Sequence, residues 1–353
     1  MKQAKNRIRE QWGEQEDNAF LRYASRMRDP IDSALIGTFA LPVPQEEKAF
    51  LYRPLENFIA AGGKRLRPVL VCLGAEVCGA NPYDALPVAA SLELFQTAAL
   101  IHDDIADQSQ SRRGLPCLYL QEGTGMALNQ GDLALIESFA SVAENEDMAP
   151  DLAIALIQEL CRMERHTAEG QALDLGWVRE NNWDVTPEDY LRMATLKTAW
   201  YTVASPLVLG ALFGDASSRL EALRTYGLNL GLAFQIVDDV LNLKGDSAAL
   251  GKDFRSDLTE GKRTLLTTYA LQQLGTTQKH ELLEILSAHT TDASVLARGV
   301  DLIESSGAFT HANTTANDLL TRAEKSLDDA QLSAGEAKNA LESLAPYITG
   351  RTY

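Results

Sequence analysis

Residues 92–107 read LELFQTAALIHDDIAD, and this stretch shows the pattern that decides the fold. It is apolar at the spacing of a helix and then ends in a cluster of aspartates. Residues 231–246, GLAFQIVDDVLNLKGD, repeat the design: another long apolar segment ends in an acidic pair. Either cluster alone could be a solvated helix end. Two clusters of the same form indicate a shared function.

The rest of the sequence also reads as helical nearly throughout. Segments with 3.6-residue periodicity are separated by short Gly, Pro and Asp punctuation, and no stretch sustains the alternation of a strand. We therefore expect an all-α protein. The predicted helices span residues 17–28, 46–61, 67–79, 85–107, 116–143, 150–177, 187–213, 217–244, 262–275, 278–288, 292–305, 309–329 and 334–348. Residues 1–45 are more polar, so we predict an N-terminal helical extension before one large domain at 46–353.

The composition narrows the classes of function. The chain has 353 residues, with 49 Asp and Glu against 32 Lys and Arg, and hence a net charge of −17. Such acidity argues against nucleic acid or an anionic membrane surface as the main partner. No apolar run reaches the roughly 18 residues of a membrane span, and the N-terminus lacks a signal-peptide pattern. The four scattered cysteines predict buried free thiols in a reducing cytoplasm.

The first acidic cluster favours a divalent cation. Asp103 and Asp107 are four residues apart, so on a helix their carboxylates stand on one face, one turn apart. These like charges repel each other, and they also lie at the negative end of the helix dipole. A bound cation removes both costs, and hard oxygen ligands in small number favour Mg²⁺. Asp104 lies between them. In the second cluster, Asp238 and Asp239 are followed by Asn242 four residues after Asp238.

Basic residues accompany both clusters. Singly, each could be a solvated surface charge, except Lys197, which interrupts an apolar helix. Together they predict an anion site, because Arg binds phosphate oxygens in a bidentate fork and Lys acts as a point charge. The residues concerned are Lys64, Arg65, Arg67, Arg112, Arg113, Lys197, Lys252 and Lys262.

These motifs together resemble the trans-isoprenyl diphosphate synthases, the polyprenyl synthetase family. The resemblance runs from about residue 46 to the C-terminus. It rests on GGKRLRP at 62–68, HDDIAD at 102–107, RRG at 112–114, GQALDL at 170–175, KT at 197–198, FQIVDD at 234–239, GKD at 251–253 and DLTEGKRTL at 257–265.

The resemblance implies a Mg²⁺-dependent head-to-tail (1′-4) prenyltransferase with the isoprenoid synthase type I fold, a helical bundle around a deep central cavity. Such an enzyme condenses isopentenyl diphosphate with an allylic diphosphate (dimethylallyl, geranyl or farnesyl) to give a longer all-trans product. Family members are usually homodimers. Their first acidic motif holds two Mg²⁺ and their second a third, all bridging the allylic diphosphate.

The resemblance also implies roles for individual residues. The metal ligands would be Asp103 and Asp107, supported by Asp104, and Asp238 with Asp239 and Asn242. The allylic diphosphate would be bound by Arg112 and Lys197, with Lys252 and Lys262 nearby. The diphosphate of isopentenyl diphosphate would be bound by Lys64, Arg67, Arg113 and Gln96. Thr198 and Gln235 would lie near the reacting carbons, completing a catalytic set with Lys197.

Three positions depart from the family pattern. Gln96 stands where the family often has His, and it can donate a hydrogen bond but carries no charge. Asn242 replaces a commoner Asp, which would weaken the third Mg²⁺ site without abolishing it. Ala199 follows the KT pair where Gly is frequent, and we expect this change to be minor.

The residues before the first aspartate predict the product length. Ala98 and Ala99 lie about one helical turn below Asp103, and small side chains there leave the product pocket open. Phe95 lies one turn deeper and would form the floor, unless it is ordinary core. We therefore expect geranylgeranyl diphosphate or a somewhat longer product.

Two alternatives stay open at this point. A class I terpene cyclase also combines a DDxxD helix end with a helical cavity, but it has no use for the cationic turn at 62–68. A non-catalytic modulatory subunit of a prenyl synthase would have degenerate metal ligands, and only Asn242 points that way.

Overall fold

The computed structural model describes residues 18–40, 42–214, 218–245 and 254–349, and these are overwhelmingly helical. The predicted all-α class is confirmed. The described residues fall into two compact units that interleave along the chain. Unit 1 comprises the described residues within 1–161, 205–220 and 332–343, and unit 2 comprises those within 162–204, 221–331 and 344–353. The single large domain with a boundary at residue 45 stays a prediction. No described helix has the length and apolarity that a membrane crossing needs.

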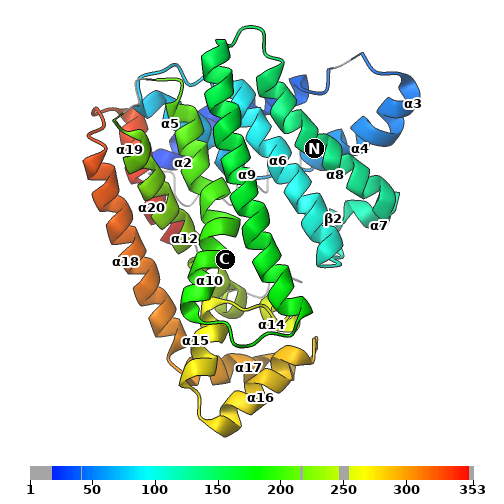
Figure 1. Cartoon of the computed structure of the whole chain (residues 1–353), viewed down its shortest axis with the longest axis vertical. Helices are drawn as coiled ribbons and strands as arrows, with labels where there is room; N and C mark the ends of the chain where they lie inside the picture. Colours follow the sequence, from blue (N-terminus) through cyan, green and yellow to red (C-terminus); the bar gives the residue numbers. More distant parts are fainter. Residues whose placement is uncertain (1–17, 41, 215–217, 246–253, 350–353) are drawn as a thin grey trace. The chain divides into compact units, whose positions relative to one another are not determined.

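Unit 1 contains most of the N-terminal half of the chain (Figure 1). Its elements are α2 (Ala19–Gly37), α3 (Gln45–Glu47), the π-helical η2 (Lys48–Tyr52), α4 (Arg53–Ala60), α5 (Leu66–Val77), α6 (Leu86–Ala106), β1 (Ser111–Arg112), β2 (Leu115–Pro116), α7 (Leu118–Glu122), α8 (Thr124–Ala143), the first part of α9 (Pro150–Arg179), α11 (Ser205–Ala211) and α19 (Glu336–Glu342).

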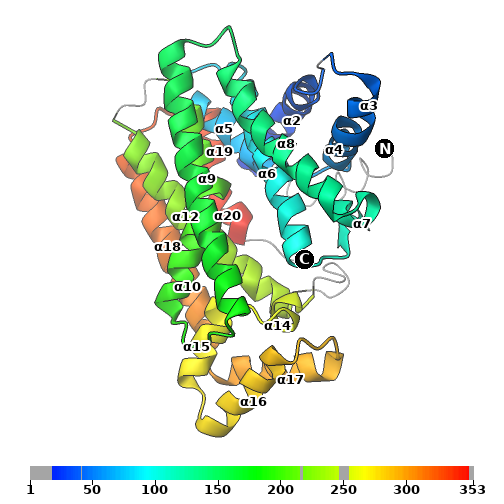
Figure 2. The ribbon, with the colours of Figure 1, turned by 45° about the vertical axis from the view of Figure 1, so that its right-hand side comes forward.

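Helix α2 is longer than predicted because its apolar face continues past Pro30. Asn18 caps its start by accepting hydrogen bonds from the backbone N–H groups of Phe20 and Leu21. Met27, Ile31 and Leu35 recur every four residues and are almost completely buried. Their burial outweighs the hydrogen bond that Pro30 removes. The helix packs against α5 and α6 within unit 1 (Figure 2).

Residues with positive φ change the predicted structure of two segments, the loop between the helices predicted at 85–107 and 116–143, and the second of these helices. Arg113 and Gly114 both have positive φ, the requirement of a tight type I′ hairpin, and they join β1 to β2. The loop predicted at 108–115 therefore contains a small hairpin. Gly123, at φ 87°, divides the helix predicted at 116–143 into α7 and α8.

Two glycines let α5 and α11 approach each other closely. A Cβ built on Gly74 would overlap the backbone carbonyl of Leu207, and a Cβ on Gly210 would overlap that of Val71. The backbones are therefore in direct contact. Elsewhere in unit 1, α6 and α8 pack along their lengths around Leu94, Ala98 and Ala134.

Unit 2 holds the end of α9 and most of the C-terminal half of the chain. Its other elements are α10 (Pro187–Ala194), the π-helical η3 (Thr195–Ala204), α12 (Leu220–Lys244), α14 (Ser256–Thr259), α15 (Leu265–Gln273), α16 (Thr276–Ser287), α17 (Ala293–Ser305), α18 (Ala308–Asp329) and α20 (Leu344–Thr349). Thr186 and Asp189 form a capping box at the start of α10.

The helix predicted at 187–213 is continuous in space but changes its winding in the middle. Residues 195–204 form the π-helical η3, a form that is rare and concentrated at functional sites. Gly170 of α9 and Gly231 of α12 hold η3 closely, because a Cβ on either would overlap the backbone at Lys197 or Ala199. Three backbones therefore fix the position of Lys197.

The contact between α5 and α11 yields a stability prediction. Gly210→Ala places a methyl group against the carbonyl of Val71, where neither helix can move without repacking. We expect the free energy of unfolding to fall by about 2 kcal/mol or more, measured by thermal and urea denaturation.

Gly176→Ala is the matched control. Gly176 is also helical, and a Cβ there meets no atom within 4 Å. Alanine should leave the melting temperature unchanged or raise it, since it favours a helix by about 1 kcal/mol over glycine. Equal effects of the two substitutions would contradict the close contact.

Candidate active site

The acidic end of α6 divides its aspartates between two environments. Asp103 and Asp107 are half-buried and one turn apart, since the backbone N–H of Asp107 donates to the carbonyl of Asp103 at 2.8 Å. Asp104 is 1% exposed and accepts from Arg112 through Nε at 2.9 Å and Nη2 at 2.5 Å. Asp104 is therefore the counter-ion of Arg112, a role that its place in the motif did not reveal.

The acidic pair fits the chemistry of Mg²⁺. Among the described residues, no group of three or more His, Cys, Asp or Glu side chains is arranged to hold a metal ion. Mg²⁺ is commonly held by one or two carboxylates and completes its shell with water and phosphate oxygens. Asp103 and Asp107 supply such a pair from one helix face, and Asp238 is a half-buried carboxylate on α12.

The cationic turn at 62–68 is held by a buried arginine. Arg65 has left-handed backbone geometry, φ 52° and ψ 32°, at the start of α5. Its side chain is 4% exposed and donates to Asp32, Glu93 and the carbonyl of Ile59. The flanking Lys64 is exposed and Arg67 is half-buried. Arg65 therefore organises the turn, while its neighbours are closer to solvent.

Arg113 is tied to the same buried carboxylate. Its Nη2 lies 3.8 Å from Glu93, its Nη1 donates to the carbonyl of Phe58 at 3.1 Å, and its guanidinium lies over the Phe58 ring. Burial lowers the pKa of Arg113, and the nearby Arg65 and Arg112 lower it further, against the opposing effect of Glu93. Glu93 thus joins the turn at 62–68 to the hairpin at 111–116.

Gln96 presents a buried polar atom that lacks a protein partner. Its Oε1 accepts no hydrogen bond from the described residues. Amide oxygen and nitrogen are assigned from their neighbours, so a rotated amide would present its N–H groups at this position instead. On α6, Gln96 is two turns before Asp103, on the same face. The contact of Gln96 with substrate stays a prediction.

The predicted chain-length residues lie on the same helix. Phe95 and Ala98 are buried and Ala99 is half-buried. Ala98 belongs to the apolar cluster that α6 shares with α8. Their influence on product length stays a prediction.

Lys197 in unit 2 is paired with a buried carboxylate. Its Nζ lies 2.5 Å from Asp174 Oδ2, and Asp174 is 7% exposed. Asp174 lies in the GQALDL stretch of α9, four residues after Gly170. Gly170 and Asp174 therefore both contact Lys197 in η3. Gly170 has no side chain, so the backbone of Lys197 can lie close to α9, and the carboxylate of Asp174 orients the Lys197 side chain.

A chain of hydrogen bonds starts from the residue after Lys197. Thr198 Oγ1 donates to Gln235 Oε1 at 2.9 Å, and Gln235 Nε2 donates to Asp239 Oδ1 at 2.7 Å. Tyr190 donates its hydroxyl proton to Asp239 Oδ2 at 2.6 Å. Burial and the neighbouring Asp257 raise the pKa of Asp239 well above its usual range, although the two donors oppose this shift. The chain fixes Thr198 and Gln235 in one arrangement.

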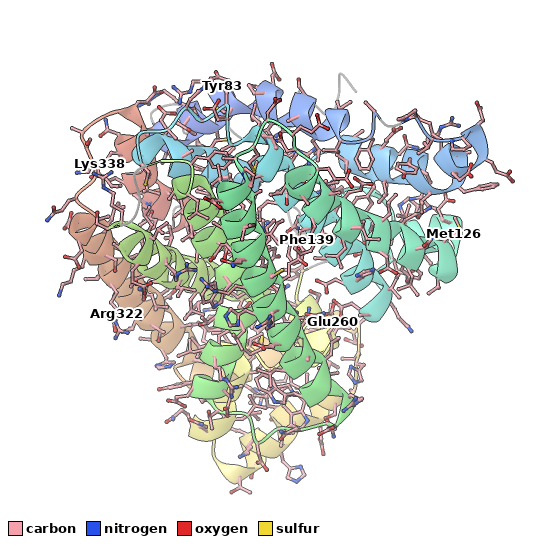
Figure 3. The ribbon with its side chains drawn as sticks, turned by 45° about the horizontal axis from the view of Figure 1, so that its top comes forward. Tyr83, Met126, Phe139, Glu260, Arg322 and Lys338 are labelled. Atoms are coloured by element: carbon pink, nitrogen blue, oxygen red, sulfur yellow. The ribbon has the colours of Figure 1, made fainter. Side chains whose placement is uncertain are left out.

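These groups line a cavity of about 90 Å³ in unit 2. Its lining residues are Asp174, Tyr190, Met193, Ala194, Lys197, Thr198, Gln235, Asp239, Asp257, Lys262, Arg263 and Thr264. Lys262 also pairs with Glu260 at 2.7 Å (Glu260 is labelled in Figure 3). Burial raises the pKa of Asp257 to about 6, against the lowering effect of Lys262. Burial lowers the pKa of Arg263 to about 10.

Asn242 is engaged by the segment that follows its helix. Its Nδ2 donates to Ser256 Oγ at 3.1 Å, and its Oδ1 accepts from the backbone N–H of Asp257 at 3.3 Å. These contacts fix the start of α14. The sequence did not suggest this structural role for Asn242. Lys252, predicted to lie near the allylic diphosphate, is outside the described residues.

In unit 2 the structure brings Lys197, Thr198, Gln235, Asp239 and Lys262 together around one cavity. In unit 1 it links Arg113 to the turn at 62–68 through Glu93. Both arrangements include partners that sequence reasoning missed. The added residues are Asp32 and Glu93 in unit 1 and Asp174, Tyr190, Asp257 and Arg263 in unit 2. A usable signal existed for three of them. Asp174, Asp257 and Arg263 are charged residues inside the GQALDL and DLTEGKRTL motifs, and all three are buried.

Comparison with known proteins identifies the family. The family model described as polyprenyl synthetase matches residues 48–303. A short chain isoprenyl diphosphate synthase of Methanothermobacter thermautotrophicus is 37% identical over 306 residues, 86% of this chain and 91% of the relative. A geranylfarnesyl diphosphate synthase of Natronomonas pharaonis is 34% identical over 329 residues, 89% of this chain and 93% of the relative.

A solved structure agrees with these relatives. The geranylgeranyl pyrophosphate synthase of Corynebacterium glutamicum, complexed with isoprenyl diphosphate and magnesium, superposes with a TM-score of 0.82 at 28% identity, covering 93% of this chain and 98% of that one. Sequence motifs, fold and relatives agree, and the chain belongs to the polyprenyl synthetase family.

Proposed function

We propose that this protein is a Mg²⁺-dependent prenyltransferase that condenses isopentenyl diphosphate with an allylic diphosphate into a longer all-trans polyprenyl diphosphate. Its relatives are named for this class of synthase, and a structural neighbour was solved with isoprenyl diphosphate and magnesium. The observation that carries the proposal is the cavity where Lys197, Thr198 and Gln235 meet. It places a fixed cation beside a rigid chain of uncharged polar groups.

The reaction begins with cleavage of the allylic C–O bond. The bonding electrons leave with the diphosphate, so negative charge grows on the leaving group and positive charge on the allylic carbon. Asp103 and Asp107 of unit 1 would hold Mg²⁺ from the first acidic motif, and Asp238 of unit 2 would hold Mg²⁺ from the second. When bound, the metal would supply Lewis-acid stabilisation of that negative charge. Arg112 and Lys197 add fixed positive charge, because Asp104 and Asp174 hold them in place before the substrate arrives.

Thr198 and Gln235 act on the carbon side of the reaction in this proposal. The Thr198 proton is donated to Gln235, so the lone pairs of Oγ1 remain to face an electron-poor carbon. Such oriented dipoles stabilise a cation without forming a bond to it. The double bond of isopentenyl diphosphate then attacks the allylic carbon. One proton leaves the new cation, and the departing diphosphate accepts it.

The second substrate is assigned to the cationic elements of unit 1. Lys64, Arg67 and Arg113 would bind the diphosphate of isopentenyl diphosphate, and Gln96 would add a hydrogen bond. The support is the shared anchor Glu93, which holds the turn at 62–68 and the hairpin at 111–116 together. A terpene cyclase uses one diphosphate substrate and would not need this second set of cations.

The test is product formation from purified protein. With Mg²⁺, isopentenyl diphosphate and each allylic diphosphate in turn, we expect a longer polyprenyl diphosphate by chromatography. Chelation of Mg²⁺ should abolish it and added Mg²⁺ restore it. A cyclised hydrocarbon formed without isopentenyl diphosphate would favour a terpene cyclase, and absence of turnover with every primer would favour a modulatory subunit.

The same assay tests both acidic motifs. Asp103→Asn and Asp238→Asn each remove one charge from a proposed Mg²⁺ ligand, and each should lower kcat/KM at least about a hundredfold. Asp318→Asn on α18 replaces an exposed aspartate and should leave kcat/KM unchanged. Wild-type turnover in either of the first two variants would remove that motif from the mechanism.

We propose a product of geranylgeranyl length or longer, with Phe95 as the floor of the product pocket. The alanines at 98 and 99 support this length, and relatives include a geranylfarnesyl synthase. Ala98→Phe should shorten the main product by at least one isoprene unit, and Phe95→Ala should lengthen it. Product chain length is measured by mass spectrometry. An unchanged distribution of product lengths in Phe95→Ala would show that Phe95 is not the floor of the product pocket.

We also propose a homodimer in the cytoplasm. Free thiols at all four cysteines suit a reducing compartment, although Cys161 is exposed rather than buried as predicted. The dimer is supported by apolar residues on the outer face of α8, where Leu128 is 43% and Ile136 62% exposed (Figure 3 labels Met126 and Phe139 on this helix).

Light scattering after size exclusion tests the dimer. Ile136→Lys should shift the mass toward that of one chain, because a charge would be buried in the interface. Ile36→Lys on α2 changes an isoleucine that is 71% exposed and should stay dimeric. A wild-type protein with the mass of one chain would refute the assignment.

A further inference from the structure

The carboxylate of Asp32, on helix α2, contacts the turn at 62–68 that is proposed to bind isopentenyl diphosphate. Asp32 Oδ1 accepts from Arg65 Nε at 2.9 Å, and Asp32 Oδ2 accepts from Arg28 Nε at 2.8 Å. Burial alone would raise the pKa of Asp32, but the hydrogen bonds and charges of Arg28 and Arg65 lower it below its usual range. Asp32 is therefore an ionised group with both oxygens engaged.

Arg65 directs each of its three side-chain nitrogens to an acceptor within the protein. Its Nε, Nη1 and Nη2 donate to Asp32, Glu93 and the carbonyl of Ile59, respectively. Its left-handed backbone is costly for a residue with a side chain, and such geometry persists only where surrounding contacts over-determine it. The side-chain contacts of Arg65 therefore set the direction of the backbone that carries Lys64 and Arg67.

Asp32 supplies one of the two carboxylates that face the guanidinium groups of Arg65 and Arg113. Glu93 is 4% exposed and is shared by Arg65 and Arg113. Two guanidinium groups would compete for one buried carboxylate if Asp32 were absent. A buried charge that loses its partner is costly, so Arg65 would move toward Glu93 or toward solvent. Either shift would reorient the turn at 62–68.

Asp32 lies outside the segment matched by the family model, which begins at residue 48. We propose that Asp32 is a positioning residue that fixes the turn at 62–68 for binding of isopentenyl diphosphate, so that α2 contributes to substrate affinity. This role rests on the proposed function. It adds a role in substrate binding to α2, whose apolar face packs within unit 1.

The test separates the two substrates kinetically. Asp32→Asn keeps the shape of the side chain and removes its charge. The KM for isopentenyl diphosphate should rise about five- to tenfold, while the KM for the allylic diphosphate changes less than about twofold. Asp32→Glu restores the charge and should recover most of the affinity. Arg28→Gln leaves the Asp32–Arg65 pair intact. It should raise the KM for isopentenyl diphosphate by a smaller factor than Asp32→Asn does, and leave the KM for the allylic diphosphate unchanged.

Asp29→Asn is the matched control, because Asp29 is an exposed aspartate on the same helix. Its KM values should equal those of the wild type. Equal rises in both KM values of Asp32→Asn, or a lower melting temperature with both KM values unchanged, would reduce Asp32 to a structural role. Product from the wild type shows that the proposed function holds in the same assay. A wild type without product would overturn the proposed function and this role with it.

Discussion

Pairing of cations with buried carboxylates organises both units of the protein. Arg112 is held by Asp104, Lys197 by Asp174, and Arg65 together with Arg113 by Glu93. A long cationic side chain has many rotamers, and ordering it during binding would weaken affinity. These carboxylates order the cations beforehand. The three carboxylates are matched by four cations, so these pairs contribute none of the excess acidity behind the net charge of −17.

Close backbone contacts give this pairing its precision. Gly170 and Gly231 allow α9 and α12 to touch η3, and η3 carries Lys197 and Thr198. The π-helical winding turns these two residues relative to an α-helix, and Asp174 and Gln235 meet them from the two neighbouring helices. A side chain at either glycine would move η3 away from both partners. Packing and chemistry at this site thus depend on the same contacts.

The sequence predicted most helices and the members of both acidic motifs, because these depend on local periodicity and composition. It missed features that depend on backbone dihedral angles or on burial by residues far away in the sequence. The helix predicted at 116–143 is interrupted at Gly123. Helix α2 continues to Gly37, past its predicted end at residue 28, because Ile31 and Leu35 are buried beyond Pro30. The hydrogen bonds by which the amide of Asn242 connects α12 to the start of α14 also depend on tertiary structure, while its role as a metal ligand stays a prediction.

The sequence by itself determined the helical class, the family and the residues that carry charge. The tertiary structure decided which charges are available to a ligand and which serve as counter-ions. Asp103 and Asp104 are adjacent and chemically identical, yet one is half-buried and the other is 1% exposed against Arg112. Asp32 meets Arg65 across 33 positions, and Asp174 meets Lys197 across 23. Such roles depend on burial and on partners far along the chain, and only folding brings these together.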